Sequence, residues 1–301
     1  MIHVIITSYK EPKATLRAVE VLLKQKVKDK FRVVVVDPFI ETEKFLNKNL
    51  GKGKIDFMLD PGIGKSDALN MIFEMYYSKN RNDVLVFTDG DVYVSDNAIE
   101  EIRKAFMDEK VGCVCGRPVP TNSRNTKYGY WAHLPFDGVD NTRKRLSREK
   151  KFFQCSGYLF GVRSSLIDSI PLDLSEDAVV PYMIWKKGFE IRYIGEAKVF
   201  VKGPENWKDW SNQKVRNIKS HENISKILPD MPRTKSLFNE IKEGIIFAIV
   251  HPSNLKEFYW MTVQAFARLY TYYRAYYEIK QKNVYNPAWR DTEINSTKPL
   301  D

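Results

Sequence analysis

The sequence predicts an α/β protein with a mixed, mostly parallel sheet flanked by helices, followed by a helical C-terminal extension. Two observations lead to this fold class. Over the first 110 residues, short apolar runs rich in β-branched side chains alternate with segments of helical periodicity. Beyond Asn206, apolar residues recur only at helical spacing. A chain of 301 residues is long enough for one large domain with an appendage.

Four strand–helix units open the chain. Each apolar run is short and continuous, which is typical of a strand buried on both faces. The expected strands are 2–9, 31–37, 54–59 and 83–89, and the expected helices are 10–25, 41–50, 66–77 and 97–107. Short connectors between such units favour right-handed crossovers, which make consecutive strands parallel.

The second half of the chain has a looser pattern. We expect a strand at 111–120, a long mobile loop over the polar and basic residues 121–151, a strand then a helix over 152–167, a helix over 175–189 that closes at Gly188, and a strand pair over 190–201. The chain is thus predicted to divide into an α/β domain (1–220), a helical, aromatic-rich extension (221–284) and a flexible tail (285–301).

Composition limits the classes of partner. Hydrophobic residues make up 43% of the chain, which predicts a packed core, and the formal net charge of +10 favours an anionic partner. Nucleic acid, phosphorylated ligands and an anionic membrane all fit that charge. No run of about 18 apolar residues is present, so we expect no membrane-spanning helix. The first residues lack a basic leader and a cleavage site, so we expect no signal peptide.

The stretch VFTDGDVYVSD is the strongest chemical signal. Asp89 and Asp91 follow an apolar strand, and residues two apart in extended chain point to the same side. Gly90 between them permits a close approach of the backbone. Two carboxylates at one site repel each other unless a cation joins them, and oxygen ligands select a hard ion, Mg²⁺ or Mn²⁺. The pair therefore predicts a metal site that bridges to substrate phosphates.

Other interpretations of this stretch stay open. A calcium-binding EF-hand loop is excluded, because it would need a glycine at Val94 and a ligand at Tyr93. A Mg²⁺-dependent phosphatase of the haloacid-dehalogenase type also places two aspartates after a strand, with Asp89 as nucleophile. A solvated turn would need no function for either carboxylate.

Further candidates follow the other predicted strands. Gly62, Gly64 and Lys65 precede a helix, where backbone N–H groups and an ammonium suit a diphosphate; an ordinary glycine turn would look the same. Asp37 ends VVVVD and can accept a hydrogen bond from a base or ribose, or can cap a turn. Asp177 opens a helix, where acids suit the helix dipole, or it is a general base.

The order of these pieces resembles the family 2 glycosyltransferases of the GT-A fold, a Rossmann-like architecture. The match runs from about residue 2 to about residue 220, through TSYKEP, VVVVD, GKSDALN, TDGD, CSGYLFGVRSSL, SED and QKVR. The resemblance implies an inverting enzyme in which residues 1–220 form the catalytic domain. Processive members carry Q-x-x-R-W; here Gln213 and Arg216 match, but Asn217 stands in place of the tryptophan.

The resemblance also implies roles for individual residues. On the nucleotide-sugar side it points to Thr7, Tyr9, Glu11, Asp37, Lys65, Asp89, Gln213 and Arg216. Asp91 is favoured over Asp89 as the direct ligand of Mg²⁺ or Mn²⁺. The acid pair Glu176–Asp177 would lie by the acceptor, with Asp177 as general base, and Ser156–Gly157 would line the acceptor side.

The implied reaction transfers a sugar from a nucleotide-sugar, most often UDP-linked, to a hydroxyl of a glycan or lipid-linked acceptor. Synthesis of glycans, cell-envelope polysaccharide or glycolipid would be its setting, and no nucleic acid partner is expected. Besides the phosphatase, the alternative is a non-enzymatic basic scaffold that binds nucleic acid or membrane. A scaffold would keep its function after loss of Asp91 and would release its partner at high salt.

The segment 254–280 predicts a long helix rich in aromatic residues, which Asn254 and Glu257 would cap. Arg268 and Arg274 interrupt it, which argues against a membrane span. Aromatic residues with arginines suit a helix in the membrane interface, although packing on the catalytic domain would explain the same pattern. We therefore expect a cytoplasmic protein with possible peripheral contact at the cytoplasmic face of the membrane.

Overall fold

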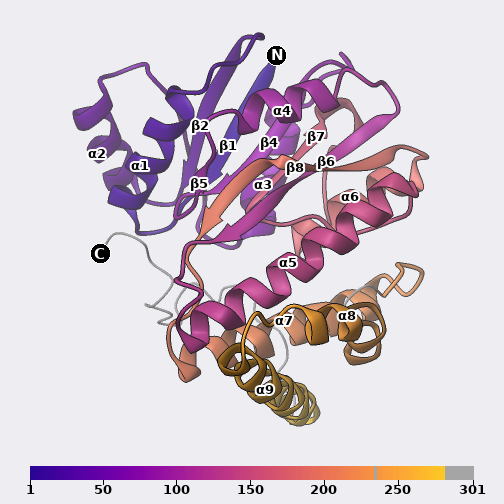
Figure 1. Cartoon of the computed structure of the whole chain (residues 1–301). Helices are drawn as coiled ribbons and strands as arrows, with labels where there is room; N and C mark the ends of the chain where they lie inside the picture. The colour runs from indigo at the N-terminus through magenta and orange to yellow at the C-terminus, as the bar shows by residue number, and fades with distance from the viewer. Residues whose placement is uncertain (234–235, 282–301) are drawn as a thin grey trace.

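Residues 1–233 and 236–281 are described by the structure, a computed structural model (Figure 1). Within them, the strands form an 8-stranded sheet in the order β3-β2-β1-β4-β7-β6-β8-β5. The strands are β1 (Ile2–Thr7), β2 (Phe31–Asp37), β3 (Asp56–Leu59), β4 (Val84–Asp89), β5 (Tyr93–Val94), β6 (Val111–Pro120), β7 (Leu159–Arg163) and β8 (Glu190–Val201). Strands β7 and β5 run antiparallel to their neighbours, and the others are parallel. The predicted mixed, mostly parallel sheet is confirmed.

Helices cover both faces of the sheet. They are α1 (Pro12–Leu23), α2 (Ile40–Leu50), α3 (Lys65–Tyr76), α4 (Ala98–Ala105), α5 (Lys127–Arg148), α6 (Glu176–Lys186), α7 (Trp207–Ile227), α8 (Leu237–Val250) and α9 (Leu255–Lys280), with a short 3-10 helix at Ser164–Leu166. Alternation along β4 separates two cores: Leu85 and Phe87 pack with α3 and α6, whereas Val84 and Val86 pack with α1 and α4.

The prediction of a long mobile loop over 121–151 is wrong, because most of it forms α5. Thr126 caps this helix by accepting a hydrogen bond from the Gly129 backbone N–H, and the helix buries its own residues Tyr130 and Trp131. Pro135 lies inside the helix and cannot donate to the Trp131 carbonyl. The side chain of Gln264, on α9, donates to that carbonyl at 2.8 Å instead. A side chain 133 residues further along the sequence than Trp131 thus replaces the hydrogen bond that α5 lacks at Pro135.

Three smaller expectations also need correction. Residues 190–201 form one strand, β8, whose pairing with β6 shifts register between Gly116 and Arg117, and not a strand pair. The helix expected at the end of 152–167 is only the three-residue 3-10 turn. The two-residue strand β5, which pairs with β8, was not predicted because two residues carry no periodicity.

The C-terminal helices α7, α8 and α9 lie together beside α5, at the end of the molecule away from α4 (Figure 1). The rings of Trp131 on α5 and Trp210 on α7 pack in a tilted arrangement with centroids 4.7 Å apart, and Arg124 forms an ion pair with Glu257 at the start of α9. Asn254 accepts from the Glu257 N–H as predicted, but the Glu257 carboxylate accepts from the Ser253 N–H. Among the described residues, no helix is long and apolar enough to cross a membrane. The predicted tail, 285–301, lies outside those residues.

Candidate active site

The carboxyl ends of β1 and β4 bring the first candidate residues together. Thr7 lies opposite Asp89 in the sheet register, and its hydroxyl donates to Asp89 Oδ1 at 2.9 Å. Gly90 follows, and its N–H donates to the Thr7 carbonyl. A β carbon at Gly90 would lie only 2.8 Å from the hydroxyl oxygen of Thr15, so the close approach expected for this glycine is present.

Lys65 connects two sides of the site. At the start of α3, its ammonium lies 2.8 Å from Asp89 Oδ1 and 2.6 Å from Glu176 Oε1, which belongs to α6. Burial alone would lower the pKa of Lys65, but the two carboxylates outweigh it and raise the pKa above the ordinary value. Lys65 is therefore charged, and it connects Asp89, the last residue of β4, to Glu176 at the start of α6.

Asp177 is the second residue of α6, and its backbone is tied to the neighbouring segment. Pro181, four residues later, has no N–H to donate to the Asp177 carbonyl. The N–H of Cys155 donates to that carbonyl at 2.9 Å. The proline thus frees one helix carbonyl, and this carbonyl anchors the chain that leads into Ser156 and Gly157.

The same segment is held from its other side by α5. The buried guanidinium of Arg143 donates to the carbonyls of Gln154 at 3.0 Å and Cys155 at 2.6 Å. Ser156 is buried, and a β carbon on Gly157 would lie 3.4 Å from Glu176 Oε1. The residues predicted for the acceptor side therefore lie against the acid pair.

Asp91 lies where a negative charge is unfavourable. Burial, followed by the charges of Asp89 and Glu11, raises its pKa to about 7. A bound cation would relieve this repulsion, and hard divalent ions prefer oxygen ligands of this kind. Among the described residues, no group of three or more His, Cys, Asp or Glu could hold a metal ion. The two aspartates therefore fit an ion only if a substrate such as a diphosphate supplies further oxygens.

Asp37, at the end of β2, is fully buried. Its Oδ1 accepts from the Phe39 N–H at 2.8 Å, while its Oδ2 has no hydrogen-bond partner among the described residues. Burial raises the pKa of this carboxyl. The ring of Tyr9 packs edge-on against Phe39 at 5.3 Å, and the Lys10 ammonium lies 5.2 Å from the Tyr9 ring. Because the Asp37 side chain is fully buried, the base of a nucleotide can reach its Oδ2 only if a neighbouring side chain moves aside.

Tyr158 is a candidate that sequence reasoning missed. Burial, then the charges of Asp91 and Asp89, raise the pKa of its hydroxyl, and Arg216 and Asp177 also act on it. The Tyr158 hydroxyl therefore lies within electrostatic range of Asp89, Asp91 and Asp177. The Thr88 hydroxyl donates to the Tyr158 carbonyl at 2.9 Å, which fixes its backbone beside β4. Its place directly after Ser156–Gly157 was the signal, but an aromatic residue entering a strand is normally core.

The remaining predicted residues lie on α7. The charge of Arg216 acts to lower the pKa of the Tyr158 hydroxyl, so Arg216 lies within electrostatic range of that side chain. Gln213 is half-buried one turn earlier on the same helix. Ser220, one turn after Arg216, shares a 2.5 Å hydrogen bond with Ser175, the residue before α6. Helix α7 therefore packs against the start of the helix that carries Asp177.

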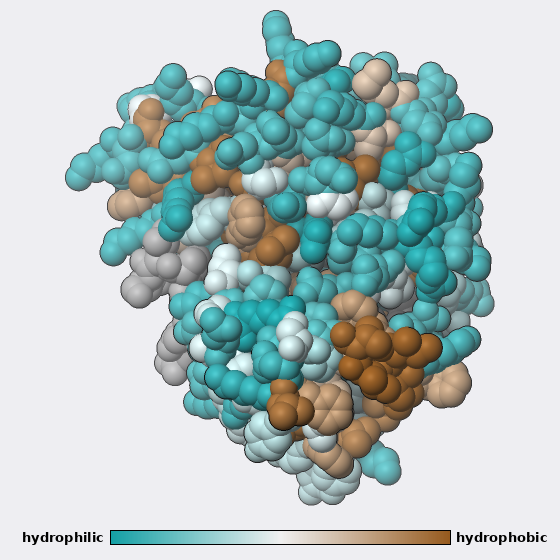
Figure 2. Space-filling view, viewed as in Figure 1, coloured by the Kyte–Doolittle hydropathy of each residue, from teal (hydrophilic) through white to brown (hydrophobic). Residues whose placement is uncertain are grey.

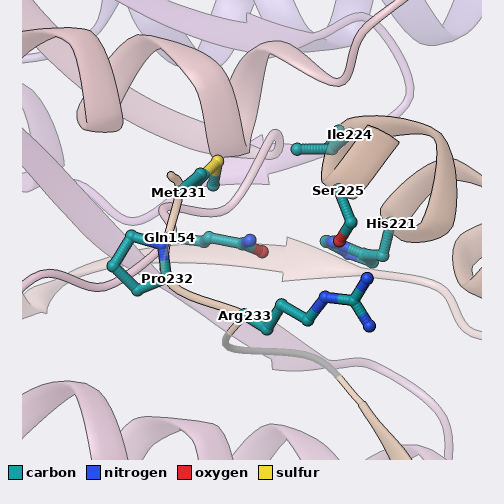
Figure 3. Close-up of a pocket in the computed structure, with 7 residues that line it drawn as sticks. All are labelled: Gln154, His221, Ile224, Ser225, Met231, Pro232 and Arg233. Atoms are coloured by element: carbon teal, nitrogen blue, oxygen red, sulfur yellow. The ribbon is translucent and has the colours of Figure 1, made fainter. Parts of the chain in front are cut away.

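A small pocket lies behind the acceptor-side segment (Figure 3). Its walls are Gln154, the loop residues Met231, Pro232 and Arg233, and the α7 residues His221, Ile224 and Ser225. Figure 3 shows the Gln154 amide between the loop and α7. The pocket holds about 10 Å³, enough for about one water molecule and too little for a sugar. We assign it no substrate.

Comparison with known proteins identifies the family. The model described as glycosyl transferase family 2 matches residues 3–170, so the chain belongs to that family, and the predicted resemblance is confirmed. It is 24% identical over 198 residues to the probable glycosyltransferase YdaM of Bacillus subtilis (strain 168), covering 63% of this chain and 44% of YdaM. It is 23% identical over 246 residues to an N-acetylglucosaminyltransferase of Rhizobium meliloti (strain 1021), covering 73% of this chain and 55% of that enzyme.

The chain spans about half the length of these two relatives. Among solved structures, the crystal structure of S. aureus TarS matches with a TM-score of 0.47 and 17% identity, over 85% of this chain and 46% of that one. Family membership favours the transferase interpretation over the phosphatase and scaffold alternatives.

Proposed function

We propose that this chain transfers a sugar from a nucleotide-sugar, with UDP favoured, to an acceptor hydroxyl in one inverting displacement. The observation that carries the proposal is the double ion pair of Lys65. It joins Asp89, on the predicted donor side, to Glu176, next to the predicted general base. One carboxylate from each predicted acid pair, although distant in the sequence, thereby contacts the same ammonium.

The donor diphosphate would bind between these groups. Asp91, with Asp89, would hold Mg²⁺ or Mn²⁺ against the phosphate oxygens. Such an ion stabilises the negative charge that develops on a leaving diphosphate. Lys65 lies at the N-terminus of α3, where its ammonium and the helix dipole favour the same negative charge. Arg216 would add a second cation, supported by its closeness to Tyr158.

Asp177 would take the proton of the acceptor hydroxyl. As that proton leaves, the oxygen attacks the anomeric carbon of the sugar, and the bond from this carbon to the diphosphate breaks. The nucleoside diphosphate departs, and the anomeric configuration inverts. The hydrogen bond from Cys155 and the clamp of Arg143 support this role, because they hold the base against Ser156–Gly157, which we propose as the acceptor wall.

On the nucleoside side, we propose that the Tyr9–Phe39 ring pair flanks the base and that Asp37 accepts a hydrogen bond from it. The unpartnered, buried oxygen of Asp37 supports this assignment, because a base N–H would satisfy it. Thr7 and Glu11 border the same region: Thr7 bonds Asp89, and Glu11 acts on Asp91. A glycan or a lipid-linked molecule would be the acceptor, and the cytoplasmic face of a membrane would be the place of reaction.

A panel of UDP-, GDP- and dTDP-sugars tests this proposal. Release of nucleotide from each donor is measured with Mn²⁺ and with a chelator, for the native chain and for Asp91→Asn. We expect release from one donor, abolished by the chelator and by Asp91→Asn. Asp96→Asn, an exposed aspartate five residues further on, is the matched control and should keep full activity. If none of the nucleotides binds in a titration with metal, the proposal fails.

A further inference from the structure

Helix α8 is strongly apolar and yet lies on the surface. None of its 14 residues, all of them described, is buried. The side chains of Phe238, Ile246 and Val250 are exposed to 74, 76 and 70%. A surface helix normally buries its apolar stripe against the core. Figure 2 shows the result as a continuous brown patch over α8.

Helix α9, which begins five residues after α8 ends, also carries exposed apolar and aromatic side chains. Helix α8 ends at Val250 and α9 begins at Leu255, and both of these residues are exposed. Along α9, exposed residues three, four or seven positions apart form one stripe, which consists of Leu255, Tyr259, Phe266, Tyr270, Tyr273 and Tyr277. Tyrosine is suited to a boundary between an apolar phase and water, because its ring is apolar and its hydroxyl is polar.

The charged side chains around this surface leave a net positive charge. The two acids of α8 are neutralised by neighbouring helices: Glu240 pairs with Arg268 on α9, and Glu243 pairs with Arg145 on α5. Lys242 and Lys256 are exposed beside the apolar residues. The whole chain carries a formal charge of +10. A second copy of the chain would be repelled by this charge, whereas an anionic surface would be attracted.

We propose that α8 and the adjoining stripe of α9 form a docking surface for a lipid bilayer that contains anionic headgroups. We define this α8–α9 apolar face by the α9 stripe above and by Phe238, Ile241, Ile245, Ile246, Ile249 and Val250 of α8. Fourteen residues of helix rise about 21 Å, less than the ~30 Å of a hydrocarbon core. Helix α8 therefore lies in the plane of the interface, with its isoleucines among the acyl chains.

The docking surface is connected to the candidate active site through α5. His251, at the end of α8, has its Nε2 3.1 Å from Asp137 Oδ2, and the neighbouring Phe136 ring lies 6.5 Å from the Tyr158 ring. A bilayer on α8 would therefore lie beside the wall that we assign to the acceptor. That the acceptor is a lipid-borne hydroxyl rests on the proposed function, whereas the docking itself does not.

Vesicle flotation with the full chain tests the docking. The probes are vesicles of phosphatidylcholine alone and of phosphatidylcholine mixed with phosphatidylglycerol. We expect the native chain to float with the mixed vesicles and less with phosphatidylcholine alone. Ile246→Asp and the triple variant Ile241→Ser, Ile245→Ser, Ile249→Ser should lower the vesicle-bound fraction by about tenfold or more, because they remove apolar area from the interface. Met107→Ser, at an apolar side chain 71% exposed beside α4, is the matched control.

Each outcome decides the question. Binding that is lost in the α8 variants and kept in Met107→Ser supports the docking surface. No flotation with either vesicle, or flotation that Ile246→Asp leaves unchanged, overturns it. Sedimentation velocity tests whether a second copy of the chain occupies this face instead. A native dimer that Ile246→Asp converts to a monomer, without vesicle binding, would assign the face to a second copy and overturn the proposal. Donor binding by Ile246→Asp, measured separately, distinguishes failure of the docking from failure of the proposed transferase function.

Discussion

At the scale of single residues, opposite charges in the site stabilise each other. Lys65 keeps its proton because Asp89 and Glu176 lie on either side of it. Asp91 forms no such ion pair with any of the described residues, and burial with two neighbouring acids raises its pKa to about 7. One carboxylate of the motif is thus compensated within the chain, while the other is left for a cation from outside.

This difference predicts how stability depends on pH. A carboxyl whose pKa rises from 3.8 to about 7 on folding binds its proton more tightly in the folded chain. The free energy of unfolding therefore falls as pH rises from about 4 to about 7 and stays low above that. The variant Asp91→Asn has no carboxyl at this position, so its free energy of unfolding does not fall for this reason as pH rises. In chelator at about pH 8, the variant should melt about 3–8 °C higher than the native chain, and at about pH 4 the two should melt together.

Differential scanning fluorimetry across this pH range measures the effect, with Asp96→Asn as the control that should follow the native chain. Mn²⁺ together with UDP, whose diphosphate supplies further oxygens, should raise the melting temperature of the native chain and raise that of Asp91→Asn less. Equal melting of native chain and variant at every pH in chelator would show that Asp91 is not destabilised by its neighbours.

At the scale of elements, two internal prolines connect distant parts of the chain. Pro135 frees the Trp131 carbonyl for Gln264, and Pro181 frees the Asp177 carbonyl for Cys155. In both helices the missing hydrogen bond is replaced by one from another segment, which docks there as a result. The first link attaches α9 to α5, and the second attaches the proposed acceptor wall to the helix of the proposed base.

A double-mutant cycle measures the first link. Gln264→Leu leaves the Trp131 carbonyl without a donor and should cost about 1–3 kcal/mol in the free energy of unfolding. Pro135→Ala restores the N–H of the helix itself. In that background, Gln264→Leu should cost less, with a coupling energy of about 1 kcal/mol in urea titrations. Additive effects of the two substitutions would mean that Gln264 does not replace the helix bond.

At the scale of the whole molecule, the sequence was sufficient to predict those elements whose patterns depend on residues close together in the chain. Apolar runs located the first four strands, and polar residues at their ends, such as Thr7 and Asp89, met because parallel strands share one edge. Helix α5 was missed because its Pro135 and its basic surface suggest a loop, while Gln264 lies far along the chain. Tyr158 was missed because only the folded chain brings it within electrostatic range of Asp89, Asp91 and Asp177.

The measurement that tests the central claim most directly is made on Asp177→Asn with the donor that the native chain uses. The central claim is that Asp177 deprotonates the acceptor at a site where the donor is held by other residues. Turnover should therefore fall by about 100- to 10 000-fold, while the donor dissociation constant in calorimetry stays unchanged. Undiminished turnover by Asp177→Asn, with the fold intact by its melting curve, would contradict the claim.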